Sequence, residues 1–221
     1  MEMFKTKTCY VCKKLTQVKT DQQKEQLSKG NYESSNYIAL EQFLYIDIEH
    51  CSHCGHCNSD ISAQVSDKVL TLSKYKSLTQ FFKLEENKNN IHHILLTGAY
   101  VLNEMGDSYN AAKAYLAVAR NLSGETYKQA KLSLSKAQQE KYEQVFAYYE
   151  KIKDYCFTTA TDLASKAYSK TANFNALVLL LYILKLSKQT QQYNTLSELI
   201  FTLPLTQEQI NLAKFITNTN E

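Results

Sequence analysis

Residues 51–57 read Cys-Ser-His-Cys-Gly-His-Cys, and residues 9–12 read Cys-Tyr-Val-Cys. Cys51 and Cys54, like Cys9 and Cys12, are separated by two residues, a spacing that lets a tight turn point both thiolates at one ion. Two such turns supply the four sulfur ligands that a tetrahedral zinc site requires. The cofactor that we predict is therefore Zn2+, and its predicted ligands are Cys9, Cys12, Cys51 and Cys54.

The zinc interpretation competes with an interpretation as two disulfides. The 38 residues between Cys12 and Cys51 exceed the roughly 15 to 20 of common zinc patterns, so the spacing alone is less diagnostic. Gly55 favours a metal-binding turn, because the residue after such a pair often needs a positive φ. Residues 1–15 lack the basic and apolar segments of a secretory signal, which predicts a cytoplasmic protein whose thiols stay reduced.

Further donor side chains crowd the second cysteine pair: His50, His53, His56 and Cys57. One interpretation is an alternative ligand set, a second metal ion or a reactive thiol, since a nearby zinc ion or cation would lower the pKa of Cys57. The other is that these residues are exposed or pack at the rim of the site. We favour the second, because one tetrahedral ion takes no more than four ligands.

The residues around the cysteine pairs predict a small lobe over residues 1–60. In residues 43–49 apolar and polar side chains alternate, which is typical of a strand with one covered face that leads into Cys51. Residues 19–36 are polar, and a loop, a short helix or an insertion remain open there. We therefore predict a zinc-ribbon-like metal-binding lobe with short β-strands.

Residues 61–221 have the pattern of an all-helical domain, so the predicted fold class is mainly α. The whole chain contains only one proline and five glycines, so few of its residues interrupt helices. Residues 176–186 read ALVLLLYILKL, about half the length of a membrane span, and predict a buried core helix. Helix breaks are expected near residues 86–90, 106–108, 123–124 and 169–173, with Ser123 as an N-cap and with Thr206 and Gln209 as a capping box.

Two stretches of this domain suggest helical hairpins. Residues 98–122 place small and large side chains as the second helix of a tetratricopeptide unit does, at Tyr109, Ala112, Leu116 and Ala119. Residues 177–203 contain a weaker version of this pattern, at Tyr193, Leu196 and Ile200. A tetratricopeptide-like domain and an ordinary helical bundle both remain open.

Other chemically notable residues have simpler interpretations. Cys156 lies in a helical stretch and is expected to be a small buried apolar residue. His92 and His93 are expected to begin a helix and to pack or face solvent. The tyrosines at near-helical spacing are typical of core and interface residues, and these are Tyr142, Tyr148, Tyr149 and Tyr155.

The run Tyr45-Ile-Asp47-Ile-Glu-His-Cys51-Ser-His-Cys54-Gly55-His56 resembles the Tyr-Asp-x-x-x-Cys-Pro-x-Cys-Gly-Tyr signature of bacterial proteins grouped as domain of unknown function family 2225. The family also has an opening cysteine pair and a helical second half similar to tetratricopeptide repeats. The resemblance implies that the four paired cysteines bind metal. The family has a proline at the position of Ser52, an aromatic residue at that of His56 and a small residue at that of Cys57. The resemblance therefore assigns a role as metal ligands to the four paired cysteines alone.

The composition also bears on function. Residues 1–60 contain 7 lysines against 8 acidic residues, and the chain has a single arginine, so nucleic-acid binding lacks the clustered cations that it needs. Four thiolates leave zinc no open position for catalysis. We therefore expect a non-enzymatic module that binds a protein or peptide, with a thiol-redox or zinc-dependent enzyme that uses Cys57 as the alternative.

Overall fold

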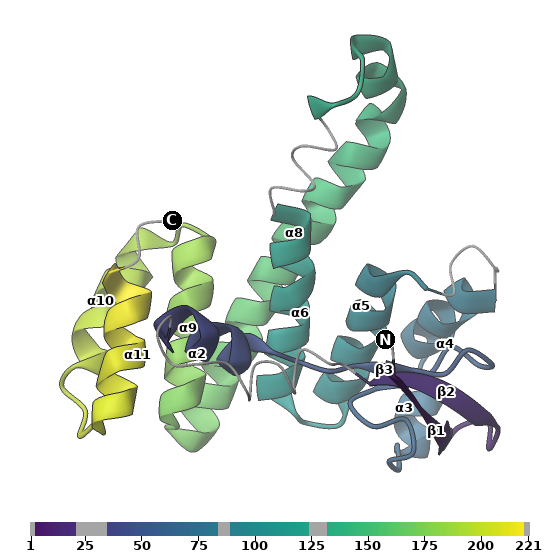
Figure 1. Cartoon of the computed structure of the whole chain (residues 1–221), viewed down its shortest axis with the longest axis horizontal. Helices are drawn as coiled ribbons and strands as arrows, with labels where there is room; N and C mark the ends of the chain where they lie inside the picture. Colours follow the sequence, from purple (N-terminus) through teal and green to yellow (C-terminus); the bar gives the residue numbers. More distant parts are fainter. Residues whose placement is uncertain (1–2, 21–34, 84–88, 124–131, 219–221) are drawn as a thin grey trace.

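The computed structural model describes residues 3–20, 35–83, 89–123 and 132–218 (Figure 1). Most of these residues are helical, and the strands form two small antiparallel sheets near the N-terminus. The predicted fold class, mainly α with a small strand-containing N-terminal lobe, is confirmed. The division into residues 1–60 and 61–221 stays a prediction.

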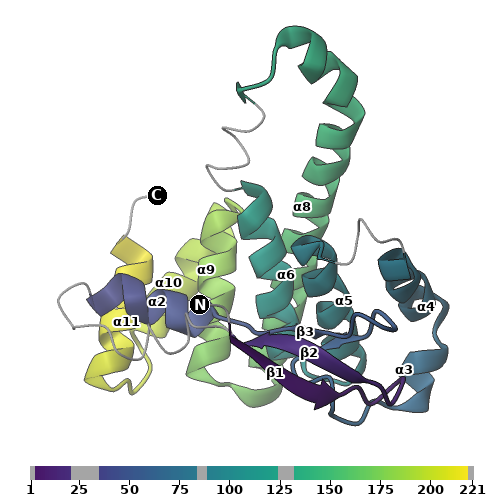
Figure 2. The ribbon, with the colours of Figure 1, turned by 45° about the vertical axis from the view of Figure 1, so that its right-hand side comes forward.

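The strands form two hairpins, and each encloses one cysteine pair. Strand β1 (Met3–Thr8) pairs with β2 (Leu15–Thr20) in a register that places Met3 opposite Thr20. Strand β3 (Glu49–His50) pairs with β4 (Cys57–Asn58), with His50 opposite Cys57. Figure 2 shows β1 and β2 side by side along one edge of the molecule, near β3. The turn of each hairpin therefore presents two cysteines.

The prediction of a strand over residues 43–49 is wrong for most of that stretch. Helix α2 (Ser35–Leu44) includes Leu44, residues 45–48 have no regular structure, and only the final residue enters β3. Leu40 and Leu44 are one helical turn apart, and both are buried in the helical core. Ile46 and Ile48 pack against the same core. Tertiary packing therefore explains the alternation, and no neighbouring strand is needed. Residues 21–34, within the undecided polar stretch, lie outside the described residues.

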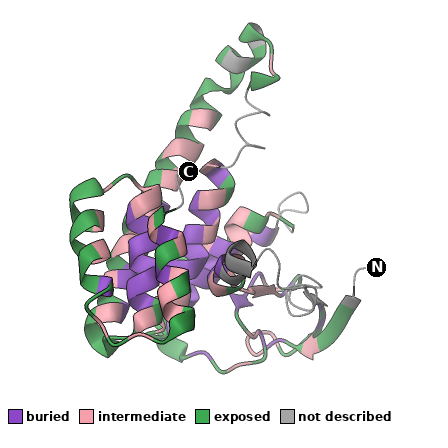
Figure 3. Cartoon of the chain, turned by 60° about the vertical axis from the view of Figure 1, so that its left-hand side comes forward, coloured by how far each residue is buried: buried purple, intermediate pink, exposed green. Residues whose placement is uncertain are grey.

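The remaining described residues are mainly helical, and most of them share one large apolar core, while α3, α4 and part of α5 form a smaller one. Figure 3 shows the buried positions gathered in the middle of the helical body, with exposed positions on the outer helices. The buried apolar residues of α9 include every position from Ala176 to Leu184, which confirms the predicted core helix. The elements are α3 (Asp67–Thr71), α4 (Ser73–Gln80), η2 (Phe81–Lys83), α5 (Ile91–Glu104), α6 (Ser108–Ser123), α8 (Lys136–Thr171), α9 (Phe174–Leu186), α10 (Thr190–Ile200) and α11 (Gln207–Asn218).

Helical pairs occupy both stretches in which hairpins were predicted. Helices α5 and α6 cover residues 98–122, and α9 and α10 cover residues 177–200. Between them lies α8, a single helix of 36 residues that packs against both α6 and α9. One half of α8 projects away from the body (Figure 1). The tetratricopeptide-like interpretation stays a prediction, and α8 explains why the middle of the chain matches that pattern poorly.

Several helix ends agree with the sequence. The Thr206 amide donates to Gln209 Oε1 at 2.9 Å and the Gln209 amide donates to Thr206 Oγ1 at 3.3 Å, which is the predicted capping box at the start of α11. The breaks near residues 106–108 and 169–173 are confirmed. Ser123 is the last residue of α6, with its hydroxyl donating to Ala119 O. The helix that it was expected to cap would begin within residues 124–131, which lie outside the described residues.

Of the four α8 tyrosines predicted at core or interface positions, three lie outside the core. Tyr142, Tyr148 and Tyr155 are exposed, by 41%, 61% and 47%. Tyr149 is half-buried against that core. Cys156, as expected, is fully buried.

Candidate metal centre

The two cysteine turns have the same backbone geometry. In the first, the Lys13 amide donates to Cys9 O at 2.9 Å and Lys13 has a φ of 59°. In the second, the Gly55 amide donates to Cys51 O at 2.9 Å and Gly55 has a φ of 75°. The positive φ expected at Gly55 is confirmed. Each turn bends the chain back so that both of its sulfurs lie on one side.

Glycine is required at position 55 for a second reason. A Cβ atom there would lie 2.6 Å from Thr79 O and 3.0 Å from Phe82 Cδ2, closer than such atoms approach. The second turn is therefore seated directly on the end of α4 and on η2. A similar close approach places Gly98 of α5 against the Ile48 side chain, which lies just before β3.

The sulfur atoms of the four predicted ligands converge. All four Sγ atoms lie within 4.8 Å of one another. The distances from Cys9 Sγ to Cys54 Sγ and from Cys12 Sγ to Cys51 Sγ are both 3.7 Å. A tetrahedron with ligands about 2.3 Å from its centre has edges of about 3.8 Å, whereas a disulfide bond is about 2.05 Å long. The cluster has the size of a metal site, and its cysteines are free thiols.

Backbone amides also point at the sulfurs. The Val11 and Cys12 amides donate to Cys9 Sγ, and the His53 and Cys54 amides donate to Cys51 Sγ. Such donors stabilise negative charge on sulfur, which is the state that a metal ligand requires. The turns are therefore built to hold thiolates.

The four sulfurs influence each other's protonation. A hydrogen bond from the Cys54 thiol lowers the pKa of Cys51 to about 4. Two causes raise the pKa of Cys54: the larger is its donation of that same hydrogen bond, and the smaller is burial. Burial raises the pKa of Cys9. Without a metal the cluster keeps protons that a divalent cation would displace, so metal binding releases protons and weakens in acid.

The additional donors near the second turn lie apart from this cluster. His56 and Cys57 are fully buried, and His53 is exposed. The Cys57 thiol donates to Gly55 O at 3.5 Å, and His53 Nε2 lies 2.9 Å from Leu15 O. Within the described part of the chain, only the four paired cysteines form a group of three or more donors close enough to share an ion. The interpretation of these residues as exposed or packing residues agrees with this arrangement.

His56, which is fully buried, and His50, which is half-buried, connect the metal centre to the helical body. His56 Nδ1 lies 3.0 Å from the Tyr75 hydroxyl on α4, and the His50 ring packs on the Phe82 ring with centroids 4.4 Å apart. Burial lowers the pKa of each histidine to about 4, so both are neutral at pH 7. The Nε2 atoms of both histidines are buried and lack a hydrogen-bond partner among the described residues. The two rings act as packing groups between the metal centre and the helices.

An ionic contact that the sequence does not indicate joins the first hairpin to the second. Lys7 Nζ lies 2.6 Å from Glu49 Oε1 and 3.1 Å from Asp60 Oδ1. The other oxygen of Glu49 accepts the Ile61 amide at 3.0 Å, and the Tyr10 amide donates to Ile61 O at 2.8 Å. Lys7 is more than 40 residues away in sequence from both of its acidic partners, and no local pattern indicates that they meet.

The centre is thus a cluster of four cysteines held between two hairpins and seated on α4, η2 and α5. Among the described residues, no helix combines the length and the apolar character needed to cross a bilayer. A scan against protein-family models and searches of curated proteins and of solved structures found no match to this chain.

Proposed function

We propose that Cys9, Cys12, Cys51 and Cys54 bind one structural Zn2+ ion and that the protein is a non-enzymatic interaction or scaffold module. The observation that carries the metal proposal is the size of the sulfur cluster: all four sulfurs lie within 4.8 Å of one another, and two of the separations are 3.7 Å, close to the edge of about 3.8 Å expected for tetrahedral zinc. Zinc accepts this geometry without electronic preference, and four thiolates leave it no position for water or substrate.

The proposal extends to the family and the compartment. The cysteine turns and the helical second half support membership of domain of unknown function family 2225, whose members resemble this chain in the same features. A four-thiolate site with reduced cysteines suits the cytoplasm, where thiols are kept reduced.

The alternative of a thiol-redox or zinc-dependent enzyme using Cys57 has less support. Cys57 is fully buried, and burial raises the pKa of its thiol well above the ordinary value. A reactive cysteine is exposed and has a lowered pKa. Charge weighs against a nucleic-acid partner, because the sole arginine, Arg120, is paired with Glu41.

A protein or peptide partner is supported by the surface of α8. The projecting half of this helix carries Tyr142, Val145 and Tyr148, which are exposed apolar or aromatic residues roughly one turn apart. Exposed aromatic residues are enriched in protein interfaces. The helices would present this surface, and zinc would hold the N-terminal lobe against them.

Metal analysis of the purified full chain tests the first part of this proposal. One zinc per chain is expected, together with its loss in Cys54→Ser and its retention in the matched variant Cys156→Ser. Iron is the other metal that favours four thiolates, and a stoichiometric iron content would contradict the zinc assignment.

The interaction role is tested by affinity purification with wild-type protein and with an α8 double variant, Tyr142→Ser and Val145→Ser. A stoichiometric protein partner that is lost in the variant is expected. Substrate turnover by the purified chain, with no such partner, would contradict the role.

A further inference from the structure

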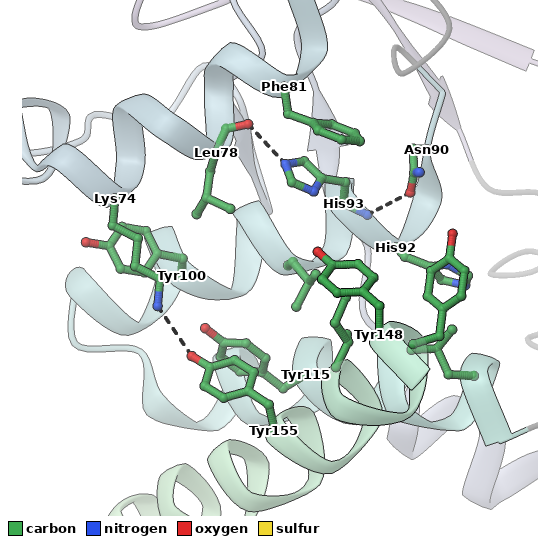
Figure 4. A pocket seen from close by; sticks show the side chains of 14 residues that line it. Lys74, Leu78, Phe81, Asn90, His92, His93, Tyr100, Tyr115, Tyr148 and Tyr155 are labelled. Carbon is green, nitrogen blue, oxygen red and sulfur yellow. Dashed lines mark hydrogen bonds between the residues drawn. The ribbon is translucent and has the colours of Figure 1, made fainter. Parts of the chain in front are cut away.

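A cavity of about 380 Å³ lies between α4, α5, α6 and α8, beside the seat of the metal centre. Its volume falls within the range of small-molecule sites. Figure 4 shows Leu78 and Phe81 on one side of the open space and Tyr115 and Tyr155 on the opposite side. The described lining residues are mostly aromatic or apolar: Lys74, Leu78, Phe81, Asn90, His92, His93, Leu96, Tyr100, Tyr115, Leu122, Tyr148, Tyr149, Ile152 and Tyr155.

Aromatic rings from η2, α5, α6 and α8 give the cavity flat walls. Tyr115 of α6 meets Tyr155 of α8 edge to face, with ring centroids 6.0 Å apart. The His93 ring stacks on Phe81 at 3.7 Å, and its Nε2 lies 3.2 Å from Leu78 O. Walls of this kind select a planar ring, because stacked and edge-to-face contacts both need a flat partner.

Lys74 gives the cavity a positive charge. Its Nζ lies 3.3 Å from the Tyr155 hydroxyl and 5.2 Å from the centre of the Tyr100 ring. Among the described lining residues it is the sole lysine or arginine, and none of them is acidic. Burial lowers the pKa values of His92 and His93, so these side chains are neutral at pH 7. An anion would meet the ammonium group, whereas a cation would be repelled by it.

We propose that this cavity binds a small planar aromatic molecule that carries one anionic group. The ring lies among the tyrosines, and the anion contacts the Lys74 ammonium group and the Tyr155 hydroxyl. Aromatic carboxylates and nucleoside monophosphates share this chemistry. Tyr148 and Tyr155 of α8 therefore form part of the wall of the site.

Fluorescence titration of the zinc-loaded full chain with matched dyes tests the proposal. Anilinonaphthalene sulfonate has the ring system and the negative charge, and phenylnaphthylamine has the same rings without the charge. Saturable binding of the sulfonate at one site per chain is expected, with at least roughly threefold weaker binding of the neutral dye. Displacement by naphthoate or by adenosine monophosphate then distinguishes the carboxylate from the nucleotide as the natural class.

Two variant pairs locate the site. Lys74→Met should weaken sulfonate binding roughly threefold to tenfold, because it removes a partly exposed charge-assisted contact, and should leave phenylnaphthylamine binding unchanged. The control Lys76→Met changes an exposed lysine on the same helix that does not line the cavity. Tyr148→Ala should weaken both dyes about fivefold or more through lost stacking, and the control Tyr142→Ala should change neither.

Each of three results would overturn the proposal. The first is the absence of saturable sulfonate binding to the folded, zinc-loaded chain. The second is an equal effect of Lys74→Met and Lys76→Met, which would place the dye elsewhere. The third is a failure of both naphthoate and adenosine monophosphate to displace the dye. None of these results bears on the metal content, so the zinc proposal is tested separately.

Discussion

The metal-binding lobe and the helical body are held together in different ways. The small core of the lobe contains Val18 and Ile61, and most of the remaining residues in it are the four cysteines themselves. The body buries a continuous set of leucines, alanines and isoleucines from α5, α6, α8, α9, α10 and α11. Because the lobe has so little apolar surface to bury, we expect the proposed zinc ion to supply most of its stability, whereas the stability of the body comes from packing.

Removal of the metal should have the largest effect and should separate the two regions. Structural zinc contributes on the order of 10 kcal/mol of binding free energy near neutral pH, and small zinc lobes are unfolded without it. After chelation, hydrogen exchange should accelerate in residues 3–20 and 49–61, while α9 keeps its protection. Equal acceleration in α9, or none in the lobe, would contradict the comparison.

A cavity created by mutation in the core of the helical body should give the opposite pattern. Leu179→Ala removes a fully buried side chain of α9 and should lower the free energy of unfolding by about 4 kcal/mol. Chemical denaturation measures this loss. The zinc content of the folded variant at 25 °C should stay at the wild-type value, and a parallel loss of zinc would show that the lobe depends on the body.

The contact between the two regions is tested at Gly55. Gly55→Ala combines a strained positive φ with a clash against Thr79 O, and should cost about 2 to 3 kcal/mol. The matched variant Gly106→Ala has the same backbone strain at a φ of 88° and open space around the new Cβ atom, so it should cost about 1 kcal/mol. Thermal denaturation of both proteins measures the difference. Equal losses would show that the second turn is not tightly seated on α4.

The smallest effect should come from the capping box of α11. Thr206→Ala removes the oxygen that accepts the Gln209 amide and should cost about 1 kcal/mol of stability. Thr158→Ala on the exposed side of α8 is the control, with an expected change within about 0.5 kcal/mol. Since α11 packs against α2 and α9, its hydrogen exchange should report the change while metal content stays constant. An unchanged melting temperature for Thr206→Ala would contradict the assigned role.

The sequence was most informative where the chemistry is local. Cysteine spacing predicted a group whose sulfurs the structure brings within 4.8 Å, and the Thr206–Gln209 spacing predicted a capping box that is present. The apolar run in residues 176–186 predicted a buried helix. In each case a few neighbouring residues carry the physical cause, namely a turn, a cap or a continuous apolar surface.

The sequence was least informative where distant residues meet. The alternation before Cys51 predicts a strand, but Ile46 and Ile48 pack against the helical body instead. That body is built mostly from residues much later in the chain, so the local pattern does not indicate it. The Lys7–Glu49 and His56–Tyr75 contacts have no local signature for the same reason. Periodicity alone also does not specify that Tyr148 of α8 is 61% exposed.

The most direct test of the account is X-ray absorption at the zinc edge on the freshly purified full chain. The account predicts a single shell of four sulfur atoms at about 2.3 Å from zinc, in wild-type protein and in Cys57→Ala alike. A shell that contains nitrogen or oxygen, a shell that changes when Cys57 is replaced, or the absence of zinc would contradict the four-thiolate centre.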